Sequence, residues 1–147
     1  MICKTLPRVN KMYYFPRDLY RYWIGRPDQS VQQDVMMRRY SHQILVTEQS
    51  FIACDMENIN DPKLKKYLKH ELFMMFGISI MVTRLNKSDE TDADLNTMWS
   101  NCKNYDSKWY KHYRWYSPLA IICIKGKFGR WLSTFFYRVA NKVVRFN

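Results

Sequence analysis

The clearest pattern in the chain is a helical alternation of apolar and polar positions near its C-terminal end. Between Lys127 and Arg145, apolar side chains recur every three or four residues, which gathers them on one helical face. That face holds Phe128, Trp131, Leu132, Phe135, Val139 and Val143, with Phe136, Ala140 and Val144 at its edge. The opposite face holds Lys127, Arg130, Thr134, Arg138, Asn141, Lys142 and Arg145. The pattern predicts an amphipathic helix over residues 127–145.

Other segments carry weaker helical patterns. Ser30 and Gln33 have the spacing of a capping box, and the helical period continues from there toward Cys54. Shorter helices are expected over residues 92–104 and 106–116. The acidic residues Asp89, Glu90, Asp92 and Asp94 lie around the start of the first of these, where they are interpreted as capping charges.

A longer helix is expected to begin at Asp61, because Pro62 follows it and proline is favoured at the first helical position. Two apolar stripes continue from there, one over Leu64–Val82 and one over Met74–Leu85. Two stripes on one helix predict that it is buried on two sides.

Near the N-terminus the pattern is that of strands. Lys11–Phe15 and Leu19–Ile24 are rich in aromatic residues, and Pro16-Arg17-Asp18 separates them, which predicts a β-hairpin. Two strands do not form a stable sheet alone, so the hairpin is expected to pack on the helices or to join a partner's sheet. The expected fold class is mainly α, an N-terminal β-hairpin followed by a bundle of four to five helices.

Length and composition are those of one folded domain, with 147 residues, 47% of them hydrophobic and 16% aromatic. The longest apolar run, Leu72–Val82, is too short to cross a bilayer, which takes about 20 residues. No signal peptide is expected, because the N-terminus lacks a long apolar region. The cysteines are scattered, which predicts neither a zinc site nor a disulfide framework and favours a reducing compartment. They are Cys3, Cys54, Cys102 and Cys123.

The net charge of +11 is concentrated in the second part of the chain. Residues 61–147 contain 16 Lys and Arg against 7 Asp and Glu, and no acidic residue follows Asp106. Such a stretch is attracted to polyanions or to an anionic membrane surface.

The break between the second expected strand and the first helix gathers polar side chains. Arg26, Asp28, Gln29 and Ser30 bring a guanidinium, a carboxylate, an amide and a hydroxyl to one helix N-terminus. The first-turn N–H groups and the helix dipole favour negative charge there, which predicts a site for a phosphate or a metal–phosphate. The alternative is that Ser30 is an ordinary N-cap and that Arg26 is solvated.

The segment Leu19–Val31, which reads L-Y-R-Y-W-I-G-R-P-D-Q-S-V, resembles a motif of family 2 glycosyltransferases. These are bacterial GT-A enzymes that build capsular, exo- and cell-wall polysaccharides, and the motif closes their catalytic region. The resemblance implies that residues 1–29 are a strand hairpin and donor-site loop, and that residues 30–147 are a helical C-terminal extension. The fold is then the remnant of an α/β GT-A fold.

The function that this resemblance implies is transfer of a sugar from a nucleotide-sugar donor to a polysaccharide or lipid-linked glycan acceptor. Arg26, Asp28, Gln29 and Ser30 would lie beside the donor diphosphate, with Arg26 neutralising the leaving group. The family's nucleotide-binding βαβ region and catalytic base have no counterpart in this sequence, and the acidic cluster at Asp89–Asp94 lacks the preceding β-strand of a D-x-D metal site. No catalytic or metal-binding residue is therefore assigned, and the chain is expected to be inactive alone. A divalent cation, Mg or Mn, is implied only for the complete enzyme, whose N-terminal half or a homo-oligomer is the expected protein partner.

The C-terminal amphipathic helix predicts contact with an anionic membrane surface, which suits a lipid-linked acceptor. The expected contact residues are Lys127, Arg130, Trp131, Phe135, Arg138 and Lys142. The alternative is that its aromatic side chains are buried against Leu72–Val82. The expected location is cytoplasmic and peripheral, on the inner face of the cell membrane.

Two other classes of function stay open. Lys108–Trp115 interleaves basic and aromatic residues, a composition that stacks bases and neutralises phosphates. Nucleic-acid binding is nevertheless disfavoured, because no RNP, KH, zinc-finger or helix-turn-helix signature is present. An unaccompanied hairpin would instead be typical of an interaction module that depends on a partner to complete its sheet.

Overall fold

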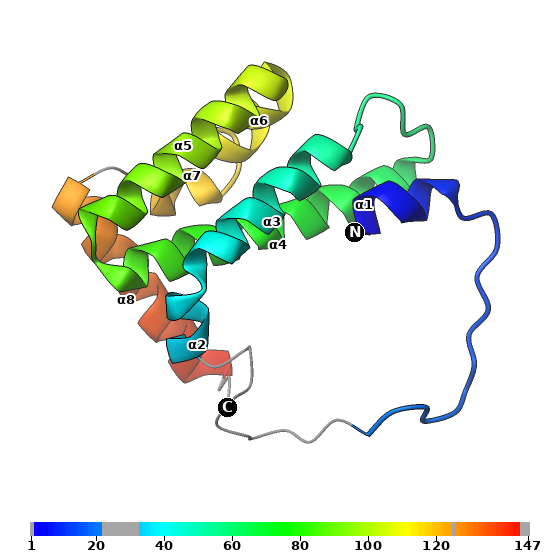
Figure 1. Cartoon of the computed structure of the whole chain (residues 1–147), viewed down its shortest axis with the longest axis horizontal. Coiled ribbons are helices and arrows are strands. Elements are labelled where there is room, and N and C mark those ends of the chain that lie inside the picture. The colour runs from blue at the N-terminus through cyan, green and yellow to red at the C-terminus, as the bar shows by residue number, and fades with distance from the viewer. Residues whose placement is uncertain (1, 22–32, 125, 145–147) are drawn as a thin grey trace.

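The computed structural model describes residues 2–21, 33–124 and 126–144, with the backbone alone for residues 140–144 (Figure 1). The described part is mainly helical. Its helices are α1 (Ile2–Thr5), the 3-10 turn η1 (Leu6–Arg8), α2 (Gln33–Arg38), α3 (Tyr40–Ala53), α4 (Pro62–Asn86), α5 (Asp89–Tyr105), α6 (Ser107–Arg114), α7 (Leu119–Ile122) and α8 (Gly126–Val144).

Helix α4 is the centre of the arrangement, and α2, α3, α5, α7 and α8 all contact it. It begins where the sequence predicts, because the Asp61 carboxylate accepts hydrogen bonds from the Lys63 and Leu64 backbone N–H groups at 2.7 and 3.3 Å. It ends at Asn86, and the next residue, Lys87, has a left-handed φ of 53° that turns the chain into α5.

Side-chain caps also define the next two helices. The Ser88 hydroxyl accepts from the Glu90 N–H, so α5 begins slightly before its predicted start. Asp106 accepts from the Lys108 and Trp109 N–H groups, both at 3.0 Å, and so begins α6. These caps confirm the predicted helices over residues 92–104 and 106–116 apart from their exact ends.

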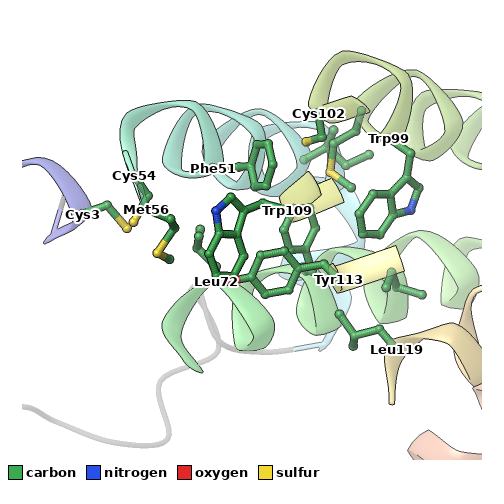
Figure 2. Close-up of a cluster of buried hydrophobic side chains, with 14 of the residues drawn as sticks. Cys3, Phe51, Cys54, Met56, Leu72, Trp99, Cys102, Trp109, Tyr113 and Leu119 are labelled. Carbon is green, nitrogen blue, oxygen red and sulfur yellow. The ribbon is translucent and has the colours of Figure 1, made fainter. Parts of the chain in front are cut away.

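The core lies between α3, α4, α5 and α6 and is rich in aromatic rings (Figure 2). Phe76 of α4 stacks on Trp99 of α5 with ring centroids 4.6 Å apart and lies 5.1 Å from Tyr113 of α6. Phe51 of α3 meets Phe76 edge-on at 5.8 Å. This packing joins the helices from Tyr40 to Arg114 into one hydrophobic unit.

The predicted β-hairpin is wrong for the part of it that the structure describes. Residues 11–21 form no strand, and their side chains are exposed. A local backbone hydrogen bond forms there, from the Arg17 N–H to the Phe15 carbonyl at 2.8 Å. The described residues contain no strand that could lie beside this segment. A β-strand is stabilised by hydrogen bonds to a neighbouring strand, so aromatic composition alone does not make one. Residues 22–24 of the second expected strand lie outside the described residues.

Two helical predictions also need correction. The helix expected from Ser30 to Cys54 is interrupted at Arg39, where φ is −105° and ψ is 22°, so α2 and α3 are separate. Its predicted start at Ser30 lies outside the described residues. On α4 the first apolar stripe is largely buried, but Met74 and Ile78 of the second stripe are exposed, so the helix is not buried on two sides.

Candidate functional site

Helix α8 presents a row of stacked aromatic rings to solvent. Phe128, Trp131 and Phe135 are 63, 58 and 48% exposed. The ring centroids of Phe128 and Trp131 are 6.0 Å apart, and those of Trp131 and Phe135 are 5.7 Å apart with planes inclined by 17°. Phe136 and Val139 are also exposed beside the row. We call Phe128, Trp131, Phe135, Phe136 and Val139 the α8 apolar face.

The side of α8 that packs on the protein is small and polar. Gly129, Ser133 and Thr134 are buried there. The Ser133 hydroxyl donates to the Ile122 carbonyl of α7 or to Gly129 within its own helix, both at 2.8 Å. A Cβ atom on Gly129 would lie 1.7 Å from the Ile124 carbonyl oxygen, so only glycine permits this approach. Small residues therefore bring α8 against α7 with its apolar face outward.

An arginine–aspartate cluster fixes that orientation. Arg130 of α8 donates to Asp92 at 2.7 Å, to Asp89 at 2.8 Å and to the Lys87 carbonyl at 2.9 Å. Arg84 of α4 donates to both Asp92 oxygens at 3.0 and 3.1 Å and to the Ile124 carbonyl at 3.1 Å. The hydrogen bonds that Arg130 donates to Asp89 and Asp92 raise the pKa of Arg130 above its ordinary value. One aspartate, Asp92, thus joins α4, α5 and α8.

The predicted membrane-contact residues divide into three groups. Lys127, Trp131, Phe135 and Arg138 have exposed side chains on α8. Arg130 instead faces the bundle and is held by the two aspartates. The side chain of Lys142 lies outside the described residues. The alternative was that the aromatic side chains of α8 are buried against Leu72–Val82. The exposure of Phe128, Trp131 and Phe135 disagrees with it.

A groove of about 520 Å³ adjoins the α8 apolar face. Lys87 and Arg138 bring two cations to its wall, and the apolar side of the same groove includes Phe135 and Val139. The groove lies between α2, the end of α4 and α8. Its lining is completed by Gln33, Leu85, Thr134 and Tyr137.

The predicted donor diphosphate-binding residues Arg26, Asp28, Gln29 and Ser30 all lie outside the described residues. The anion-binding site at these residues therefore stays a prediction from the sequence.

The basic-aromatic run over residues 108–115 is largely used in folding. Trp109 and Tyr113 are buried in the core, and buried Arg114 donates to the Cys123 carbonyl at 3.1 Å. Lys108 pairs with Glu57 at 2.7 Å, and Lys69 lies 5.1 Å from the centre of the Trp109 ring. Few rings of this run are thus presented to a base, which disfavours a stacking platform for nucleic acid.

His112 lies on the same helix, between Trp109 and Tyr113. Burial, and secondly the nearby charge of Lys69, lower the pKa of His112 below its ordinary value. Both causes disfavour the protonated ring, so His112 is a neutral packing residue near pH 7.

In residues 2–21, 33–124 and 126–144, no three His, Cys, Asp or Glu side chains are grouped closely enough to hold a metal ion. Within the same part of the chain, no helix combines the length and the apolar character needed to cross a bilayer.

Comparison with known proteins identifies no relative of the chain. No family model matches the chain, and no curated protein or solved structure is significantly similar to it.

Proposed function

We propose that this chain is the helical C-terminal portion of a family 2-like glycosyltransferase and that α8 holds it on an anionic membrane surface. The observation that carries the membrane part is the α8 apolar face, with Phe128, Trp131 and Phe135 stacked and exposed. Aromatic rings are favoured at the level of lipid headgroups, where their apolar bodies leave water. A lipid-linked acceptor would meet the enzyme at this surface.

Charge supports the choice of an anionic bilayer over other apolar partners. Lys127 and Arg138 are exposed on the same helix, and Lys87 lines the adjoining groove with Arg138. No acidic residue follows Asp106 in the sequence, so the C-terminal part carries no acidic side chain that anionic lipids would repel. Each Lys or Arg near such a surface contributes about 1 kcal/mol of attraction.

The test is co-sedimentation of the purified chain with vesicles of phosphatidylcholine alone or mixed with phosphatidylglycerol. We expect binding to the anionic vesicles at low salt. Trp131→Ser removes a ring whose burial is worth about 1.5–3 kcal/mol, so the partition coefficient should fall roughly 10- to 100-fold. The matched control is Trp115→Ser, because Trp115 is also 58% exposed but lies after α6.

The contribution of charge has its own control. Lys127→Gln with Arg138→Gln should weaken binding to anionic vesicles about 30-fold, at about 1 kcal/mol for each cation. Lys63→Gln with Lys103→Gln removes equal charge from exposed positions on α4 and α5. Equal losses in the two double variants would indicate attraction by net charge alone and would contradict docking through α8.

The sugar-transfer part of the proposal is supported by the motif Leu19–Val31 and by the mainly helical chain that follows it. A family 2 enzyme also requires a nucleotide-binding region with a D-x-D metal site. Asp92-Ala93-Asp94 has those letters, but it lies in helix α5, where Asp92 pairs with Arg84 and Arg130. The proposal therefore includes a separate polypeptide or coding segment that supplies that region. Sequencing the DNA on both sides of the coding segment tests this, since a βαβ region with D-x-D should be encoded there.

The motif makes a kinetic prediction for the assembled enzyme. Arg26→Ala should lower turnover about 10²-fold or more, because one group that stabilises the departing diphosphate is removed. Turnover is measured as nucleoside diphosphate released from the nucleotide-sugar. Unchanged turnover would mean that residues 26–30 only cap a helix.

A further inference from the structure

Two cysteine thiols that are distant in the sequence meet at one edge of the core. Cys3 belongs to α1, and Cys54 follows the last residue of α3. Both are buried in the same hydrophobic cluster as Met56, and Figure 2 shows the Cys3 and Cys54 sulfur atoms adjacent to each other. The two thiols are hydrogen-bonded, and α1 packs on α3.

The hydrogen bond makes the two thiols chemically different. The bond from the Cys54 thiol lowers the pKa of Cys3, while donating that bond, together with burial, raises the pKa of Cys54. Cys3 is therefore the sulfur that ionises first, and Cys54 keeps its proton. The other two cysteines have no thiol neighbour of this kind. Burial, and secondly the nearby charge of Glu48, raise the pKa of Cys102 to about 12, and burial raises the pKa of Cys123 to about 11.

We infer that Cys3 and Cys54 form a reversible redox site, oxidised to a disulfide by a peroxide and reduced again by a dithiol. The Cys3 thiolate attacks one peroxide oxygen, the O–O bond breaks, and Cys3 becomes a sulfenic acid as hydroxide leaves. The Cys54 sulfur then attacks the Cys3 sulfur, and the sulfenic oxygen leaves as water with the Cys54 proton. Two thiols lose two electrons and two protons in total, and hydrogen peroxide becomes two waters.

The bond would join α1 covalently to the end of α3. It would close the chain between residues 3 and 54, a loop that contains the exposed residues 9–21. Because a cross-link restricts the unfolded chain far more than the folded one, closing a loop of this length stabilises the protein. This inference does not depend on the proposed membrane docking or on sugar transfer.

The experiment treats the full chain with a small excess of hydrogen peroxide, blocks free thiols with an alkylating reagent and maps the peptides by mass spectrometry. We expect one cross-linked peptide pair, Cys3 with Cys54, while Cys102 and Cys123 are alkylated only after unfolding. Dithiothreitol should restore four thiols. The oxidised chain should also melt roughly 5–10 °C higher than the reduced chain.

Two variants separate this site from general oxidation. Cys54→Ser leaves Cys3 without its partner, so peroxide should carry Cys3 to sulfinic acid with no cross-link. Cys102→Ser changes an equally buried thiol and should leave the cross-link unchanged. Four alkylatable thiols after peroxide treatment, or cross-links that involve Cys102 or Cys123 as often, would overturn the inference. Since the wild-type peptide map decides the question, a variant that fails to fold does not obscure it.

Discussion

At the scale of single residues, Asp92 has a role that its position does not reveal. The sequence places it among acidic residues at a helix start, and capping is what such residues usually do. The structure instead has Asp92 between Arg84 and Arg130, which are 8 and 38 positions away. A pairing of this kind depends on how α4, α5 and α8 are arranged, so no local pattern could predict it. The contact between Cys3 and Cys54 could not be predicted locally either, because the two residues are distant in the sequence and adjacent only in the fold.

Asp92→Asn should therefore destabilise the protein more than its partial exposure suggests. The change leaves two arginines without their shared counter-charge, and breaking such a pair costs about 3 kcal/mol. The side chain of Asp92 is 19% exposed, whereas that of Asp89, which binds the same Arg130, is fully exposed. Chemical denaturation is the measurement, and Asp89→Asn is the control that should change little. Equal losses of stability would show that Asp92 is not the centre of the cluster.

His112 gives the fold a pH dependence near neutrality. Its pKa is lower in the folded chain than the ordinary 6.5 that it regains on unfolding, so the unfolded state binds the proton more readily. Stability is then complete above about pH 6.5 and falls as the pH drops through the interval down to the folded-state pKa. Thermal unfolding between about pH 7.5 and pH 5 should show this slope. In His112→Gln the slope over that interval should largely disappear, and an unchanged slope would assign it to other groups.

At the scale of elements, the periodicity of residues 127–145 predicts α8 well but not the direction in which it faces. A helical period separates an apolar side from a polar side, and burial of the apolar side is the usual outcome. In α8 the apolar side instead faces solvent. Gly129 and Ser133 permit close packing of the other side, and Arg130 on that side donates to the carboxylates of Asp89 and Asp92. The sequence signals for this orientation were the two small residues Gly129 and Ser133 and the arginine Arg130.

Gly129→Ala should disturb this packing directly. The added Cβ would lie 1.7 Å from the Ile124 carbonyl oxygen, so the backbone between α7 and α8 must shift. We expect a loss of about 2–3 kcal/mol in denaturation experiments, as for other overpacked sites. The comparison is Gly126→Ala, where φ is +82° but a Cβ meets nothing within 4 Å, so only the backbone term of about 1 kcal/mol applies. A smaller loss at position 129 than at position 126 would contradict the described contact.

At the scale of the whole molecule, the sequence predicts a mainly helical chain correctly and its N-terminal hairpin incorrectly. Helices with caps and long apolar stripes, such as α4, carry their own local signals. A strand has no such independence, since it needs a second strand to pair with, and the described part of the chain contains no strand. The candidate donor site at residues 26–30 follows directly after the expected hairpin and stays a prediction.

The distribution of charge over the molecule gives the membrane proposal a salt test. Attraction of the exposed cations to lipid is screened by ions, whereas the pair between Arg84 and Asp92 is largely shielded from solvent. Raising NaCl from about 0.02 to about 0.5 M should release the chain from anionic vesicles while its near-UV circular dichroism stays constant. Release accompanied by loss of that signal would point to unfolding instead.

The exposed segment over residues 9–21 makes the chain an evident target for proteolysis. Tyr13, Tyr14 and Phe15 are exposed and lie in no helix or strand, so chymotrypsin, which cuts after aromatic residues, should cleave among its first sites there. In the reduced protein, the cut leaves α1 attached only by its packing. In the oxidised protein, the small N-terminal fragment should stay with the large one on a denaturing gel and separate only when a thiol is added.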